Sequence, residues 1–173
     1  EILGIGGLKG AGGDELLGIL FGDEKETSGK IWVDHKEYAH KNPNHAMKNG
    51  FSLLPGERTL EGLITSFSIK DNINMGAMKT KGFLLDKSQE TEIANKMIKE
   101  VTIKTPSCEM PCDSLSGGNM QKVVIAKCLA TNPKILLLNN PTRGIDVGAR
   151  LEIYTVIRNL AKEGMGIILL SED

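Results

Sequence analysis

The sequence LSGGNMQKVVIAKCLATNPKILLL, which runs from Leu115 to Leu138, contains three structural signals in succession. A serine and two glycines come first and are followed by a helical pattern of apolar residues. Pro133 ends that pattern, and the run ILLL then predicts a buried strand. A serine and two glycines at a helix start present a hydroxyl and bare N–H groups to an anion, and the helix dipole favours that anion. The simpler interpretation is an N-cap serine followed by flexible glycines.

Similar strands and helices alternate on both sides of this stretch. Further strands are predicted within residues 1–7, 26–33, 51–54 and 165–173. Further helices are predicted within residues 14–22, 42–50, 87–101 and 147–164. Short all-apolar strands that alternate with helices predict an α/β fold with a mainly parallel sheet covered on both faces.

Residues 59–113 differ from the rest, because they are polar and carry helical pattern without strand pattern. We therefore expect a single domain, 1–173, in which an α/β core formed by 1–58 and 114–173 carries an inserted helical lobe, 59–113.

The composition is that of an ordinary soluble globular protein, with 40% apolar and 25% charged residues and a net charge of −1. Nothing in this balance indicates nucleic acid as a partner, and no apolar run is long enough for a membrane span. Cys108, Cys112 and Cys128 form no CxxC pair, so we expect reduced thiols, with a zinc site as the weaker alternative.

The loop GLKGAGGD, from Gly7 to Asp14, lies between a predicted strand and a predicted helix. Its glycines allow the backbone to curl and point N–H groups at an anion. Nucleotide loops read G-x-x-x-x-G-K-[ST], and here Gly13 stands in place of the lysine and Asp14 in place of the hydroxyl. A tight strand-to-helix turn is the alternative, and Lys9 could substitute for the missing lysine.

Taken together, these motifs resemble the P-loop ATP-binding domains of ABC transporters. The resemblance is strongest to the second nucleotide-binding half of the ATP-binding subunit of importers for simple sugars such as ribose, galactose and xylose. It rests on EILGIGGLKGAG, LLPGERTLEGL, SIKDNI, IKTPS, the Leu115–Leu138 stretch and PTRGIDVGARLEIYTVIRNLA, which cover nearly the whole chain. The resemblance implies that two such domains close face to face, with each ATP held between the glycine loop of one and the LSGGN motif of the other.

The resemblance also shows where this sequence departs from an active member. Asn139 stands where the family's magnesium-organising aspartate belongs, and Asn140 stands where its catalytic glutamate belongs. Glu172 takes the place of the switch histidine, and PGER, residues 55–58, takes the place of the usual P-E-D-R. Hard cations favour carboxylates, and an amide cannot accept a proton near neutral pH. We therefore expect weak or absent hydrolysis at the domain's own loop, and doubtful binding of ATP and Mg²⁺ there.

The LSGGN motif, in contrast, matches the family. The nucleotide-binding residues implied by the resemblance are Gly7, Gly10, Ala11, Gly12, Gly13, Asp14, Ser116, Gly117, Gly118, Asn119, Gln121 and Asp146. Asp14 and Asn139 mark the degenerate magnesium positions. The expected partners are the first nucleotide-binding half of the same subunit, or a second copy, and transmembrane permease subunits that dock on the helical lobe. The expected location is cytoplasmic, on the inner face of the cell membrane.

Three further expectations concern single residues and the ends of the chain. Trp32 is predicted as a core residue on a strand. His35, His40 and His45 recur every five residues, which suits neither a helix face nor alternate strand positions, so a solvated loop is expected. The family's N-terminal strands, with their adenine-stacking aromatic, and its last strands and helices are missing from the sequence, so a truncated domain is expected.

Several other functions remain open from the sequence alone. One is an active ATPase in which Lys9, Asp14 and Glu172 compensate for the lost groups. Another is a structural module that binds the permease and no nucleotide. A third, an ABC protein of chromosome maintenance or translation, is disfavoured by the PGER and IKTPS segments and by the lack of long coiled-coil or basic stretches.

Overall fold

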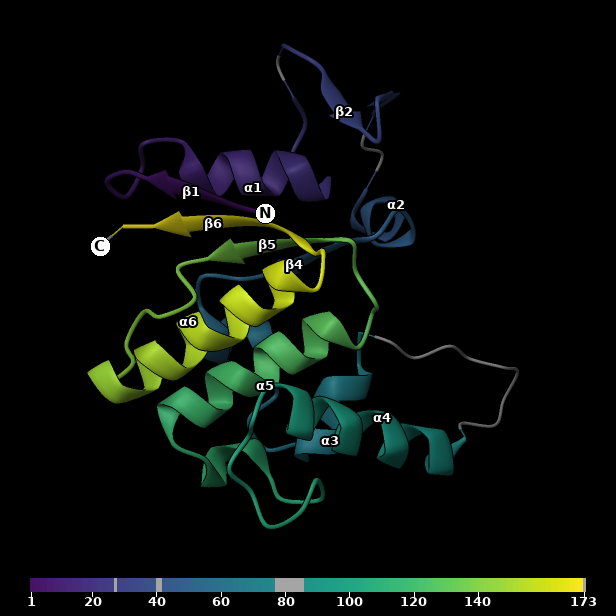
Figure 1. Cartoon of the computed structure of the whole chain (residues 1–173), viewed down its shortest axis with the longest axis vertical. Coiled ribbons are helices and arrows are strands. Elements are labelled where there is room, and N and C mark those ends of the chain that lie inside the picture. The colour runs from purple at the N-terminus through teal and green to yellow at the C-terminus, as the bar shows by residue number, and fades with distance from the viewer. Residues whose placement is uncertain (27, 40–41, 77–85, 173) are drawn as a thin grey trace.

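The computed structural model describes residues 1–26, 28–39, 42–76 and 86–172 (Figure 1). Expectations that concern His40, residues 77–85 of the predicted lobe and Asp173 lie outside the described residues. Within the described ranges, each helix is too short or too polar to cross a membrane.

A parallel sheet forms the centre of the molecule. Its strands are β1 (Ile2–Gly6), β4 (Phe51–Leu54), β5 (Ile135–Asn139) and β6 (Gly166–Ser171), in the spatial order β1-β6-β5-β4. Leu54 pairs with Leu138, and Leu138 pairs with Leu169, so the carboxyl ends of these strands meet at one edge. In open parallel sheets, ligands bind outside that edge. The predicted parallel α/β fold is confirmed.

Helices cover both faces of this sheet, and Figure 1 shows α1 on one side and α5 and α6 on the other. Leu17 of α1 (Gly13–Phe21) and Ala46 of α2 (Pro43–Lys48) pack with Phe51, Leu137 and Leu170. A larger apolar cluster joins the opposite face to α5 (Gly117–Leu129) and α6 (Val147–Lys162). Burial on both faces explains why β5 begins with the apolar run ILLL and why β4 is apolar except at Ser52.

The described part of the segment after β4 contains short helices joined by turns and irregular stretches, with one isolated β-bridge between Ser68 and Pro111. A π-helical turn (Arg58–Gly62) leads to α3 (Ile69–Asn74), α4 (Lys87–Glu100) and a 3₁₀ turn (Cys112–Ser114). These helices pack against α5, so the helix that carries the LSGGN motif lies between them and the sheet. The boundaries of the inserted lobe at 59 and 113 stay predictions.

A hairpin, β2 (Ile31–Val33) paired with β3 (Lys36–Tyr38), lies outside this sheet and corrects the expectation for Trp32. Trp32 lies on β2 as expected, but it is 60% exposed and is not a core residue. The hairpin turns at Asp34 and His35, which both have positive φ, as a two-residue type I′ turn requires. The pairing partner is short and polar, which explains why apolar pattern did not reveal it.

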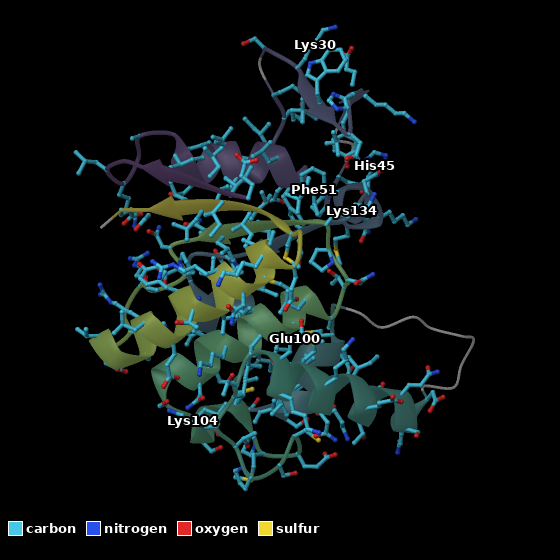
Figure 2. All side chains as sticks on the ribbon, viewed as in Figure 1. Lys30, His45, Phe51, Glu100, Lys104 and Lys134 are labelled. Atoms are coloured by element: carbon cyan, nitrogen blue, oxygen red, sulfur yellow. The ribbon has the colours of Figure 1, made fainter. Side chains whose placement is uncertain are left out.

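The solvated-loop expectation fails for His45, which lies in α2. Its ring stacks on Tyr38 with 5.4 Å between centroids, and Tyr38 stacks in turn on Phe51. Figure 2 shows His45 and Phe51 close together where α2 meets β4. Helix α2 is capped by Asn42, whose side chain accepts the His45 N–H, and Pro43 occupies its first position.

Candidate functional site at the carboxyl edge of the sheet

The predicted glycine loop lies between β1 and α1. Gly10 and Gly12 have φ values of 81° and 96°, a left-handed conformation that favours glycine. Gly12 is the N-cap of α1 and has no side chain with which to cap it, so no N-cap side chain occupies the first-turn N–H groups of α1. The structure thus brings together the six loop residues predicted from the sequence, which are Gly7, Gly10, Ala11, Gly12, Gly13 and Asp14.

Gly13 is packed too closely for a larger residue in this conformation. A Cβ atom at Gly13 would lie 2.5 Å from Cδ1 of Leu170, which is buried in the sheet. A lysine at this position would therefore require the Leu170 side chain to move. The local packing is therefore matched to glycine at this position.

Four polar side chains form a continuous hydrogen-bonded chain across the carboxyl edge. Asn139 donates its amide to Asp14 Oδ1 at 2.7 Å, and Asn140 donates its amide to Asn139 Oδ1 at 3.0 Å and to Glu172 Oε1 at 3.2 Å. The Glu172 backbone N–H returns a bond to Asn140 Oδ1 at 2.9 Å. The chain therefore runs from one carboxylate, through two amides, to a second carboxylate.

The orientation of both amides follows from the Glu172 backbone. A backbone N–H can only donate, so it fixes the oxygen of Asn140 and leaves the Asn140 amide nitrogen toward Asn139 and Glu172. The oxygen of Asn139 then accepts, and its nitrogen faces Asp14. Each carboxylate receives an N–H, which the strand could not supply if it ended in Asp-Glu.

A cavity of about 320 Å³ adjoins these hydrogen-bonded side chains and lies between α1, β4 and β5. Its ionisable lining is mainly acidic: Asp14, Asp23, Glu24, Glu57, Glu61 and Glu172, against Lys9 and Arg143. Arg143 is already paired with Glu57 at 2.8 Å. Over the glycine loop itself the hollow measures about 50 Å³, which suffices for a few water molecules at about 10–15 Å³ each.

The LSGGN motif forms the start of α5. Ser116 is exposed and is the N-cap, and its Oγ accepts the side-chain amide of Asn119 at 3.0 Å. Gly118 lies against α6, where an added Cβ would come within 2.5 Å of the Ala149 Cβ. Gln121 is only 4% exposed, so its role in nucleotide binding stays a prediction.

Asp146 caps α6, because its Oδ1 accepts the Ala149 N–H at 2.9 Å. Arg58 of PGER holds the loop before Asp146, a contact that was not predicted from the sequence. Arg58 donates to the carbonyl oxygen of Arg143 at 3.1 Å and lies 3.3 Å from the Cβ position of Gly117. One guanidinium therefore binds the RGID loop and lies beside the first turn of α5. No sequence pattern indicated this contact, because Arg58 is a single arginine in a polar segment.

A parallel sheet with a glycine loop, a second helix start at Ser116 and polar residues at its carboxyl edge defines a nucleotide-binding domain of the P-loop class. A comparison with protein families matches residues 1–143 to the family described as "ABC transporter". The chain belongs to the ABC transporter family, and its fold is that of an ABC ATP-binding cassette.

Two relatives in bacteria illustrate the match. The chain is 45% identical to the ribose import ATP-binding protein RbsA of Bacillus subtilis and 41% identical to the xylose import ATP-binding protein XylG of Moorella thermoacetica. Each match covers 100% of this chain but only 36% and 35%, respectively, of the relative. The chain thus spans about a third of the length of these relatives, and it matches their second half.

Solved structures support the fold. A nucleotide-free ATP-binding cassette from an ABC transporter superposes with a TM-score of 0.85 at 22% identity, covering 99% of this chain and 70% of that one. A dimeric cassette bound to ADP and phosphate gives 0.82 at 22% identity, covering 100% and 75%.

Proposed function

We propose that this chain is the second nucleotide-binding domain of a sugar importer's ATP-binding subunit and that it completes the ATP site of a partner domain. In this proposal its LSGGN motif acts on ATP held by the partner, while its own glycine loop hydrolyses little or no ATP. The names and identities of the ribose and xylose import relatives support the sugar-import class.

The charge around the chain's own loop argues against a triphosphate there. Asp14 directs a carboxylate to the position where the family places a hydroxyl, and most ionisable residues of the adjoining cavity are acidic. Two like charges 4 Å apart repel by about 1 kcal/mol in water and about 4 kcal/mol near a protein surface. Among the described residues that line the hollow over the loop, Lys9 is the one with a positive charge. The larger cavity adds Arg143, which is paired with Glu57.

The groups that would hold magnesium and activate water also fit poorly. Asn139 and Asn140 offer neutral amides, and the carboxylate of Asp14 is bonded to Asn139. Among the residues that the structure describes, no group of three or more His, Cys, Asp and Glu side chains is arranged to hold a metal. A missing general base alone lowers a rate by about 10²–10⁴. Taken together, these features favour a site that has lost hydrolysis.

The start of α5 carries the proposed activity. Ser116 is exposed, its oxygen already accepts an N–H from Asn119, and its hydroxyl hydrogen is therefore free to point outward. With the first-turn N–H groups of α5, it would bind and orient the terminal phosphate of an ATP held by a partner. This intact helix start is the observation that carries the proposal.

The proposed permease partner has a suitable docking place. A cavity of about 450 Å³ lies between α2, β4, α3 and α5 and is lined in part by Phe21, Met47, Leu53 and Met75. Flexible methionines and an aromatic ring suit the apolar face of a short helix. Such docking would place this domain on the inner face of the membrane, in the cytoplasm.

Phosphate release by this chain mixed with its partner half tests the proposal. We expect hydrolysis that depends on both halves and falls at least 10²-fold with Ser116→Arg, because a bulky cation replaces the hydroxyl. Ser88→Arg, on exposed α4, is the matched control and should leave the rate unchanged. Equal rates with both variants would contradict the shared site. Failure of ATP to bind the mixture would favour a structural module instead.

A further inference from the structure

The hydroxyl of Ser116 is held by a chain of contacts that begins at a buried lysine. Lys122 of α5 is 2% exposed, and its Nζ donates to Glu152 Oε2 at 2.6 Å and to the Thr102 carbonyl oxygen at 2.9 Å. A buried ammonium without such partners would be costly, so both contacts are required. They tie α5 to α6 and to the segment that follows α4.

Glu152 also binds a second lysine, Lys104, which lies in the segment that follows α4. Its Oε1 accepts Lys104 Nζ at 2.9 Å, so one carboxylate bridges a buried and an exposed ammonium. These two lysines lower the pKa of Glu152 to about 2. Figure 2 shows Lys104 on the side of the helices that faces away from the sheet. Residues 102–104 are thus fixed at the Thr102 carbonyl and at the Lys104 ammonium.

The fixed segment orients the LSGGN motif. The backbone N–H of Lys104 donates to Asn119 Oδ1 at 2.9 Å. Because that N–H can only donate, the Asn119 amide nitrogen must face Ser116, where it donates to Oγ at 3.0 Å. The hydroxyl oxygen is then occupied as an acceptor, and its hydrogen is left for an anion.

We propose that Glu152 is a positioning residue for the Ser116 hydroxyl, acting through Lys104 and Asn119. The inference rests on the proposed function, since it deepens the role given there to the LSGGN motif. Glu152 does not touch the phosphate in this account. It holds residues 102–104 at the place where the Lys104 N–H fixes the Asn119 amide.

Two variants and one matched control test this inference. Glu152→Gln removes the bridging charge, and Lys104→Met breaks the exposed contact while the Lys122–Glu152 pair stays intact. Glu163→Gln, an exposed charge change just after α6, is the control. If Glu152→Gln fails to fold, Lys104→Met still tests the chain of contacts.

The first readout needs no partner. In NMR spectra of this chain, both variants should shift the Asn119 side-chain amide, Glu152→Gln should also shift the Lys104 backbone amide, and Glu163→Gln should shift neither. The second readout is ATP hydrolysis with the partner half: kcat should fall about tenfold to a hundredfold while KM changes less than about twofold. Unmoved Asn119 and Lys104 signals, or an unchanged kcat, would overturn the inference. If even the wild-type pair is inactive, the proposed function fails, whereas the NMR result still decides whether Glu152 positions Asn119.

Discussion

Asn139 donates its side-chain amide to Asp14 at 2.7 Å, and this bond joins the carboxyl end of β5 to the first turn of α1. Asp14 and Glu172 are carboxylates, and Asn139 and Asn140 are amides. The proposed function takes these four residues as replacements for the hydroxyl, the histidine and the two carboxylates of an active member. They are complementary to one another, because each carboxylate accepts an N–H from one of the amides.

This complementarity predicts that restoring one usual residue alone is harmful. Asn139→Asp would place a second carboxylate beside Asp14, and we expect a loss of about 1–3 kcal/mol in the free energy of unfolding at pH 7. Like charges raise each other's pKa, so the loss should shrink as the pH falls toward 4. Urea denaturation at several pH values measures it. Asn95→Asp, exposed on α4, is the control, and an equal effect of both variants would contradict the hydrogen-bond assignment.

The glycine loop gives a second prediction, from packing. Gly13→Ala directs a Cβ at Leu170, so we expect a loss of about 1–3 kcal/mol in stability. Gly4→Ala, on β1, meets nothing within 4 Å and should change stability by less than about 0.5 kcal/mol. Thermal melting of the two variants compares them. A harmless Gly13→Ala would show that the loop can accept the lysine of an active member after all.

Much of the fold could be predicted because burial leaves a plain pattern in the sequence. The apolar runs of β4, β5 and β6 and the apolar face of α4 gave those elements within a residue or two of their observed bounds. Trp32 was misassigned because an apolar residue on a short strand reads as core even when the hairpin projects from the sheet. Strand β3, with the polar sequence KEY, carried no such pattern.

The candidate site was predicted as a set of positions, whereas its contacts were not. Family resemblance placed Asp14, Asn139, Asn140 and Glu172 at one edge. The direction of each hydrogen bond depends on the backbone N–H of Glu172, which no sequence pattern reveals. Glu152 was missed for the same reason, because its partners come from residues 104 and 122.

The lowered pKa of Glu152 predicts a pH dependence of stability. Its folded pKa of about 2 lies below the ordinary 4.5, so its contribution is fully present above about pH 4.5 and is lost as the pH falls through about 2. The melting temperature of Glu152→Gln should therefore fall below that of the wild type at pH 7, and the difference should narrow between pH 4.5 and 2. A difference that stays constant over this range would argue against the ion pairs. Glu163→Gln should show no such trend.

The three cysteines give a prediction about reactivity. Cys108, Cys112 and Cys128 are free and buried, and burial raises the pKa of the Cys112 and Cys128 thiols to about 11. Since the thiolate is the reactive form, a disulfide reagent at pH 8 should label the native chain slowly. Full reaction of three thiols should follow only on denaturation. Rapid labelling of the native protein would contradict the buried positions.

Steady-state phosphate release by this chain alone, compared with that of its own Asn140→Ala variant purified in parallel, tests the central claim most directly. We expect equal, background-level release from both proteins, because the wild-type amide is no more able to accept a proton than alanine. Release by the wild type clearly above that of Asn140→Ala, with saturation in ATP, would contradict the claim that this domain's own site does not hydrolyse ATP.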